Sequence, residues 1–207
     1  MTRMTDKIMK RVSAHGRGKW VCTPKDFLDL GSREAVDQAL SRLVKAGQLR
    51  RVGRGLYDMP RISSVLKRPA PVDLEAAIAA LARQTGARIM LGGLEAANQL
   101  GLTNAVPAQA CYVTSGPSRT VKIGGQTVQF RRASPSVMQW AGKPAAPVAQ
   151  ALRWLGPDAA ADTEVVSTLK RHLPDEVKRN LRKNSRYLPG WALPLVRSIT
   201  TDQVVAA

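Results

Sequence analysis

Apolar residues recur every three to four positions between residues 32 and 46, which is the spacing of an amphipathic helix. Ser32 is a favourable N-cap for this helix. A shorter helix is predicted just before it, because Thr23 and Pro24 form a typical helix start and Gly31 a typical stop. The apolar stripe of the longer helix consists of Val36, Leu40, Leu43 and Val44. The chain is therefore expected to contain two consecutive helices joined by a tight turn.

The segment after these helices has the pattern of a β-hairpin. Leu49–Val52 and Leu56–Met59 are expected to be strands, joined by a Gly-Arg-Gly turn at 53–55 that can adopt positive φ. Trp20–Cys22 is expected to add a third strand, and Met4–Ala14 a further helix. This order of elements predicts a winged helix-turn-helix, whose second helix enters the major groove of DNA.

The predicted winged helix-turn-helix occupies residues 1–62, and residues 63–72, with prolines at 69 and 71, are typical of a linker. Residues 73–207 are predicted to form a second domain of mixed α and β structure. Its expected helices are 73–84, 93–100, 147–155, 161–173 and 174–185, its expected strand is 110–114, and its expected hairpin is 121–130. The predicted fold class is α+β, with the winged helix-turn-helix followed by a mixed α/β C-terminal domain.

The charge of the chain favours a polyanionic partner. Lys and Arg number 32 against 15 Asp and Glu, which gives a formal net charge of +17. Residues 1–61 hold 14 basic and 6 acidic side chains, and residues 62–207 hold 18 and 9, so both predicted domains are basic. This composition is consistent with double-stranded DNA as a partner.

Candidate DNA contacts lie on the outer face of the longer helix and on the hairpin. An amide such as Gln38 suits adenine, and arginines such as Arg42 suit guanine or phosphate. The hairpin arginines are expected to contact phosphate, because no acidic side chain lies between them in the sequence. The full set of candidates is Ser32, Arg33, Gln38, Ser41, Arg42, Lys45, Arg50, Arg51 and Arg54.

Signatures of catalysis, metal binding or cofactor binding are weak. His15 and His172 lie in different predicted domains without a second ligand at metal-binding spacing. Cys22 and Cys111 are expected to be buried thiols of a reducing compartment. No apolar run approaches the roughly 20 residues that span a bilayer, and the N-terminus lacks the centre of a signal peptide. The sequence thus predicts a cytoplasmic protein that is not an enzyme and that needs no cofactor or metal.

Two stretches of the chain are similar to a known family. Both stretches resemble AbiEi-family antitoxins of type IV toxin-antitoxin, or abortive infection, systems. The first contains KWVCTPKDFLDLG, AVDQALSRLVKAGQLRRV and GRGLYDMP, and the second runs from LGGLEAANQLGL to VKIGGQTVQFRR. The resemblance covers about residues 5–135. It implies a repressor of its own operon, whose second domain counters a nucleotidyltransferase-like toxin without a stable complex.

The resemblance and the motif together predict binding to promoter DNA of the protein's own operon. Operators of such proteins are often inverted repeats, which a homodimer could match, although no residue here fixes a dimer interface. The competing interpretation is a winged-helix adaptor that binds protein or RNA without operator specificity. The basic segment 170–186 is compatible with a second nucleic-acid contact, an acidic partner or a solvated face.

Overall fold

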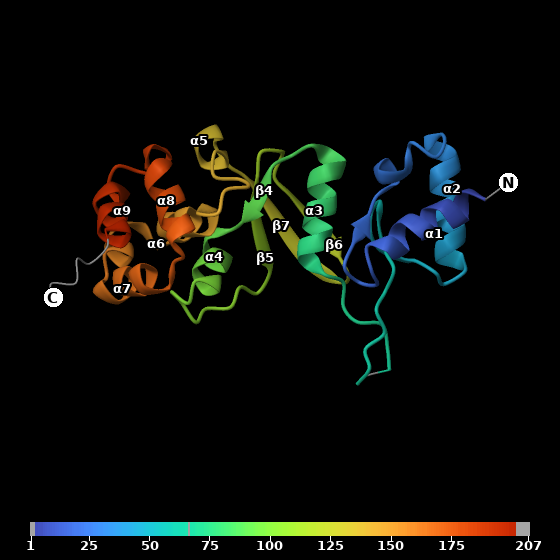
Figure 1. The fold of residues 1–207 in the computed structure, drawn as a ribbon, viewed down its shortest axis with the longest axis horizontal. Helices are drawn as coiled ribbons and strands as arrows, with labels where there is room; N and C mark the ends of the chain where they lie inside the picture. The colour runs from blue at the N-terminus through green and yellow to red at the C-terminus, as the bar shows by residue number, and fades with distance from the viewer. Residues whose placement is uncertain (1–2, 66, 202–207) are drawn as a thin grey trace. The chain divides into compact units, whose positions relative to one another are not determined.

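The computed structural model describes residues 3–65 and 67–201, which form two compact units (Figure 1). Unit 1 consists of residues 1–87 together with 121–127, and unit 2 of residues 88–120 together with 128–207. The described chain contains a three-stranded and a four-stranded sheet among many helices, so the fold class is α+β as predicted.

Unit 1 follows the order of elements expected from the sequence. Its first elements are α1 (Met4–Ala14), β1 (Val21–Cys22), η1 (Pro24–Phe27), α2 (Arg33–Lys45), β2 (Arg50–Gly53) and β3 (Leu56–Asp58). The antiparallel sheet has the order β1-β3-β2. The short helix before α2 is a single 3-10 turn that ends at Phe27, several residues before the predicted stop at Gly31.

The core of unit 1 lies between α1, η1, α2 and the small sheet. Phe27 and Leu40 are fully buried, and so are Ile8 and Val12 of α1. The buried stripe of α2 is Val36, Ala39, Leu40 and Leu43. The predicted stripe is therefore correct: Val44 is half-buried and packs against the same core, and Ala39 is buried beside the stripe.

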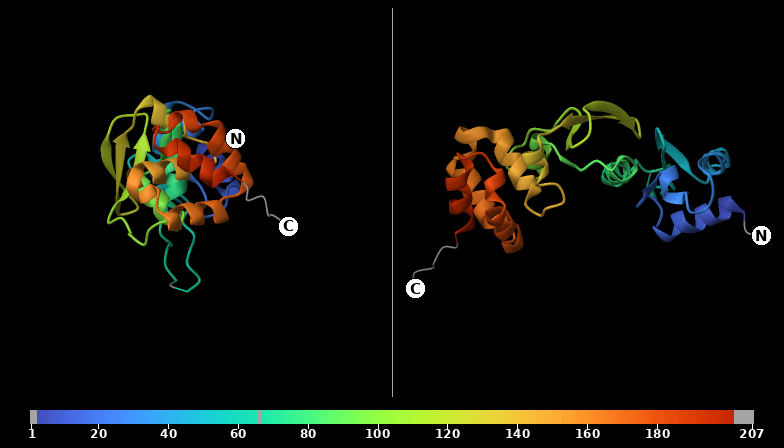
Figure 2. Two further views of the ribbon diagram at one scale, coloured as in Figure 1. Left: turned by 90° about the vertical axis from the view of Figure 1, so that its left-hand side faces the viewer. Right: turned by 90° about the horizontal axis from the view of Figure 1, so that it is seen from above.

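The boundary between the units differs from the predicted one. Helix α3 (Leu74–Thr85), assigned to the second domain from the sequence, belongs to unit 1, where it packs against β1 and β3. The predicted linker 63–72 also has backbone hydrogen bonds: the Ala70 N–H donates to the Arg61 carbonyl at 2.8 Å. Residues 61–65 and 67–70 belong to a narrow loop of unit 1, seen in teal in Figure 2. The division between the units consequently falls at Ala87.

The tip of a hairpin from the second half of the chain also belongs to unit 1. Strands β6 (Arg119–Ile123) and β7 (Gln126–Arg132) meet at a turn in which the Gly124 N–H donates to the carbonyl of Val52 at 2.8 Å. Gly124 has φ +58, and a Cβ there would lie 2.2 Å from Val72, so the close approach requires glycine. This contact covers part of the edge strand β2.

Unit 2 combines the remaining sheet with a helical region. Its other elements are β4 (Ile89–Leu91), α4 (Gly93–Gln99), β5 (Ala110–Thr114), α5 (Pro135–Met138), α6 (Ala146–Ala160), α7 (Thr163–His172), α8 (Asp175–Lys183), η2 (Ser185–Tyr187) and α9 (Ala192–Thr200). The sheet order is β4-β5-β7-β6, with β5 and β7 parallel. Trp140, Leu152, Leu169, Leu181 and Ile199 are fully buried in its helical core. Within the described residues, no helix is both long and apolar enough to cross a bilayer.

Candidate nucleic-acid interface

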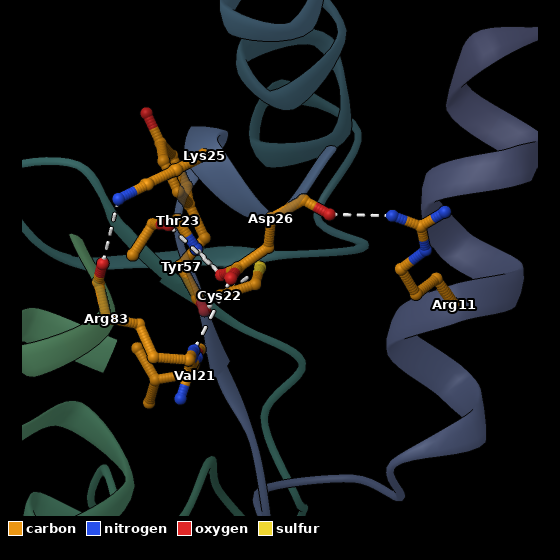
Figure 3. A network of polar contacts seen from close by, with 8 residues as sticks. All are labelled: Arg11, Val21, Cys22, Thr23, Lys25, Asp26, Tyr57 and Arg83. Atoms are coloured by element: carbon orange, nitrogen blue, oxygen red, sulfur yellow. Dashed lines mark hydrogen bonds and ion pairs between the residues drawn. The ribbon is translucent and has the colours of Figure 1, made fainter. Parts of the chain in front are cut away.

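The position of α2 depends on the short element η1 that precedes it. Asp26 closes η1 by accepting hydrogen bonds from Thr23: the backbone N–H at 2.8 Å and the hydroxyl at 3.0 Å, both to Oδ2 (Figure 3). Ser32 then caps α2 as predicted, because its hydroxyl oxygen accepts the N–H of Ala35 at 3.3 Å. Two consecutive caps thus set where each helix starts.

Two arginines fasten η1 to the neighbouring helices (Figure 3). Arg11 of α1 donates to the Asp26 carbonyl at 2.6 Å and forms a bidentate pair with Asp29, at 2.8 and 2.6 Å. These hydrogen bonds hold the pKa of Asp29 below its ordinary value. Arg83 of α3 donates to the Val21 carbonyl at 2.8 Å and lies 3.4 Å from the Asp26 carboxylate. Helices α1 and α3 therefore hold η1 from two sides.

The outward face of α2 carries most of the predicted contacts. Gln38, Ser41, Arg42 and Lys45 are all exposed. Arg33 is exposed as well, but its Nε lies 2.8 Å from Asp37 in an i,i+4 pair, which partly neutralises it. Gln38 and Arg42 are one turn apart, and neither is bound to another side chain in the part of the chain that the structure describes. Their polar groups are thus free for an external partner.

Gln38 and Arg42 also line a hollow of about 440 Å³ between α2 and the start of α1, called here the α1–α2 hollow. Its wall residues include no carboxylate: they are Arg3, Met4, Thr5, Ala35, Gln38, Ala39 and Arg42. Met4, Ala35 and Ala39 are its apolar members, and Thr5, Gln38 and the two arginines are its polar members. This surface therefore offers apolar contact and hydrogen-bond donors side by side.

Among the three hairpin arginines, Arg50 has a structural role. It lies directly opposite Asp58 in the β2–β3 pairing, and it binds this carboxylate through Nε at 3.0 Å and Nη2 at 2.6 Å. Its Nη1 donates to the Ala70 carbonyl at 2.9 Å. The Asp58 side chain is 2% exposed, and its hydrogen bonds raise the pKa of Arg50 further above the ordinary value. The predicted phosphate contact by Arg50 is thus not supported.

Arg51 and Arg54 remain exposed, as expected for phosphate contacts. The turn takes its shape from Gly55, whose φ is +70. Lys122, an exposed residue of the β6–β7 tip beside β2, was not predicted from the sequence. Arg3 and Thr5, which share the α1–α2 hollow with Gln38, were not predicted either. No local pattern connects these residues to α2, because the contacts join distant segments.

Burial suppresses the ionisation of both cysteines. Cys22 is buried and donates to the Tyr57 carbonyl at 3.4 Å, and burial raises the pKa of its thiol to about 12. Burial also raises the pKa of Cys111, which is half-buried. Both thiols are consequently protonated at neutral pH and weak nucleophiles. Within the described ranges, no group of three His, Cys, Asp or Glu residues could hold a metal ion.

Fold and surface together define a two-unit α+β protein with an exposed polar helix face beside a basic hairpin. A model of a family of unknown function (DUF6088) matches residues 7–181, and the chain belongs to this family. No curated protein matches the chain. The crystal structure of the RV2827C protein from Mycobacterium tuberculosis is similar at 18% identity and a TM-score of 0.42, covering 98% of this chain and 83% of that chain.

The different roles of Arg50 and Arg51 predict different effects on stability. Arg50→Ala would leave Asp58 buried without its partner, so we expect the free energy of unfolding to fall by about 3–5 kcal/mol. Arg51→Ala, the matched control on the same strand, should change it by less than about 0.5 kcal/mol because that side chain is exposed. Urea denaturation of the full chain, followed by circular dichroism, measures both. Equal midpoints for the two variants would contradict the structural role of Arg50.

Proposed function

We propose that this protein is a sequence-specific DNA-binding transcriptional repressor and that its residues 1–62 act as a winged helix-turn-helix. The observation that carries the proposal is the exposed face of α2, where Gln38 and Arg42 stand together without competing partners among the described residues. Exposed Arg51 and Arg54 on the adjoining hairpin add positive charge suited to phosphate. The net charge of +17 supports a polyanionic partner.

In this proposal α2 enters the major groove and the β2–β3 hairpin follows the backbone. Gln38 donates to and accepts from the edge of an adenine, and Arg42 donates to guanine or to phosphate. Arg51, Arg54 and Lys122 contact phosphates, which orients the protein on the duplex without reading its sequence. Binding at a promoter would repress transcription by excluding polymerase. The protein would act in the cytoplasm without catalysis or cofactor.

We further propose that the protein is a type IV antitoxin. The support is its resemblance to AbiEi-family antitoxins over about residues 5–135, which reaches beyond the winged segment into unit 2. Unit 2 would then contribute to protection against a nucleotidyltransferase-like toxin encoded beside it. Co-expression of that toxin with the full-length chain should restore growth. Failure to restore growth at matched protein abundance would refute this role and leave the DNA-binding proposal standing.

DNA binding should depend strongly on salt and on sequence. We expect the protein to bind its own upstream DNA better than random duplex, with affinity falling about 10³- to 10⁵-fold between roughly 50 and 200 mM salt if 6–10 phosphates are contacted. Gln38→Ala should relax preference at one base pair, at a cost of about 1–3 kcal/mol. Arg54→Ala should instead weaken binding to all sequences alike.

Fluorescence anisotropy with labelled duplexes measures these effects. Arg171→Ala, which removes one exposed cation in unit 2, is the charge-matched control for Arg54→Ala and should leave the affinity for each duplex unchanged. A protein-binding adaptor would show no preference for upstream DNA. Equal affinity for upstream and random duplex, or unchanged preference in Gln38→Ala, is the result that refutes the proposed reading of bases by α2.

The α1–α2 hollow predicts that a thymine methyl group contributes to operator recognition. Its apolar wall, which includes Ala35, lies beside Gln38, and an adenine read by Gln38 is paired with thymine. Replacing that thymine with deoxyuridine removes one methyl group, which should weaken binding about fourfold, the equivalent of about 0.8 kcal/mol. Ala35→Ser should abolish this sensitivity while retaining binding. Equal affinity for every single thymine-to-deoxyuridine substitution would contradict the methyl contact.

A further inference from the structure

Three of the four cations of α8 are exposed on the side of the helix that faces away from the core of unit 2. Leu181 is fully buried and anchors α8, while Arg179, Arg182 and Lys183 are exposed. Helix α9 packs against α8. The α8 part of the basic segment 170–186 therefore forms an ordered surface beside α9.

Part of this surface is a hollow of about 220 Å³ between the two helices, called here the α8–α9 hollow. It is lined by Asp175, Lys178, Arg179 and Arg182 of α8 and by Thr200 of α9. Three cations thus face a single carboxylate. Lys183 of the same helix does not line the hollow.

The ion pairing inside the hollow is weak. The Lys178 side chain is only 17% exposed, and its Nζ lies 4.0 Å from Asp175, whose own side chain is 79% exposed. A pair at 4.0 Å with an exposed carboxylate is weak, so most of the Lys178 charge is uncompensated. Arg179 and Arg182 have no ion pair with the rest of the described chain. The hollow therefore has an unsatisfied positive charge.

We propose that the α8–α9 hollow binds the phosphate group of a nucleotide or a nucleic acid. With three cations and one carboxylate the hollow has a formal charge of +2, which matches the charge of about −1.5 to −2 on a phosphate monoester at neutral pH. Guanidinium forks from Arg179 and Arg182 suit the geometry of phosphate oxygens, and Lys178 adds a point charge. A carboxylate or a backbone phosphodiester brings a single charge, so the charge balance favours a terminal phosphate group.

The size of the hollow agrees with a phosphate group as the bound moiety. Pockets for whole small organic ligands usually measure about 300–1,000 Å³, and this one is smaller. Thr200 donates its hydroxyl proton to the Val196 carbonyl at 2.7 Å, so the donors for phosphate come from the three cations. The base or sugar of the ligand would lie outside the hollow.

Two variants of the full chain with equal net charge test the site. Arg179→Gln with Arg182→Gln removes two cations of the hollow, and Arg171→Gln with Lys183→Gln removes two exposed cations that do not line it. Binding of ATP and of inorganic phosphate is measured by isothermal titration calorimetry at constant ionic strength in chloride. We expect the first variant to bind about tenfold or more weakly, since charge-assisted hydrogen bonds are lost, and the control to bind within about twofold of wild type.

Single-stranded oligonucleotides then distinguish the sources of the phosphate. The bound group is a terminal phosphate if the 5′-phosphorylated oligonucleotide binds more tightly than its 5′-hydroxyl form and the hollow variant loses this difference. The bound groups are backbone phosphates if both forms bind equally and the hollow variant, but not the control variant, binds both more weakly. Absence of ATP, phosphate and oligonucleotide binding, equal weakening in both variants, or tighter binding of a hexaglutamate peptide than of the phosphate ligands would overturn the proposal.

Discussion

The arrangement of unit 1 depends on Asp26, which closes its own 3-10 turn and contacts both α1 and α3. Its carboxylate accepts two hydrogen bonds from Thr23 and lies beside Arg83, and its carbonyl accepts one from Arg11. Because the Asp26 side chain is 16% exposed, water competes little for these contacts. They fix η1 between α1 and α3, and η1 leads directly into α2. The outward direction of the candidate recognition face therefore follows from a short polar network centred on the largely buried Asp26 carboxylate.

The same constraint divides the arginines of unit 1 into two groups. Arg11, Arg83 and Arg50 are held by carboxylates and carbonyls of the unit itself, so their charge stabilises the fold. Arg42 and Arg54 are exposed and have no such partner in the described residues. High net charge alone does not distinguish these roles. The proposed interface consists of the second group. Its guanidinium groups can bind a ligand without first breaking a hydrogen bond or ion pair within the protein.

Local patterns predicted the first helices and the small sheet well. Met4–Ala14 and the Ser32 cap are confirmed, because spacing and capping are determined by neighbouring residues. The pairing of Arg50 with Asp58 could have been predicted from the hairpin register, which places the two opposite each other. The position of α3 could not, since Arg83 meets Val21 across 62 positions of sequence. Helix α9 and strand β4 were not predicted. The hollow beside the basic helix α8 could not be predicted either, because it forms where α9 packs against α8.

Hydrogen–deuterium exchange of the full chain, with and without a duplex of its own upstream DNA, tests the central claim most directly. The account predicts that protection on binding is concentrated in residues 32–46 and 51–55 and at the 121–127 tip, because these segments carry the proposed contacts. A scrambled duplex of equal length and salt concentration is the control and should protect them less. Protection confined to other segments, or equal protection by both duplexes, would contradict recognition of DNA by α2.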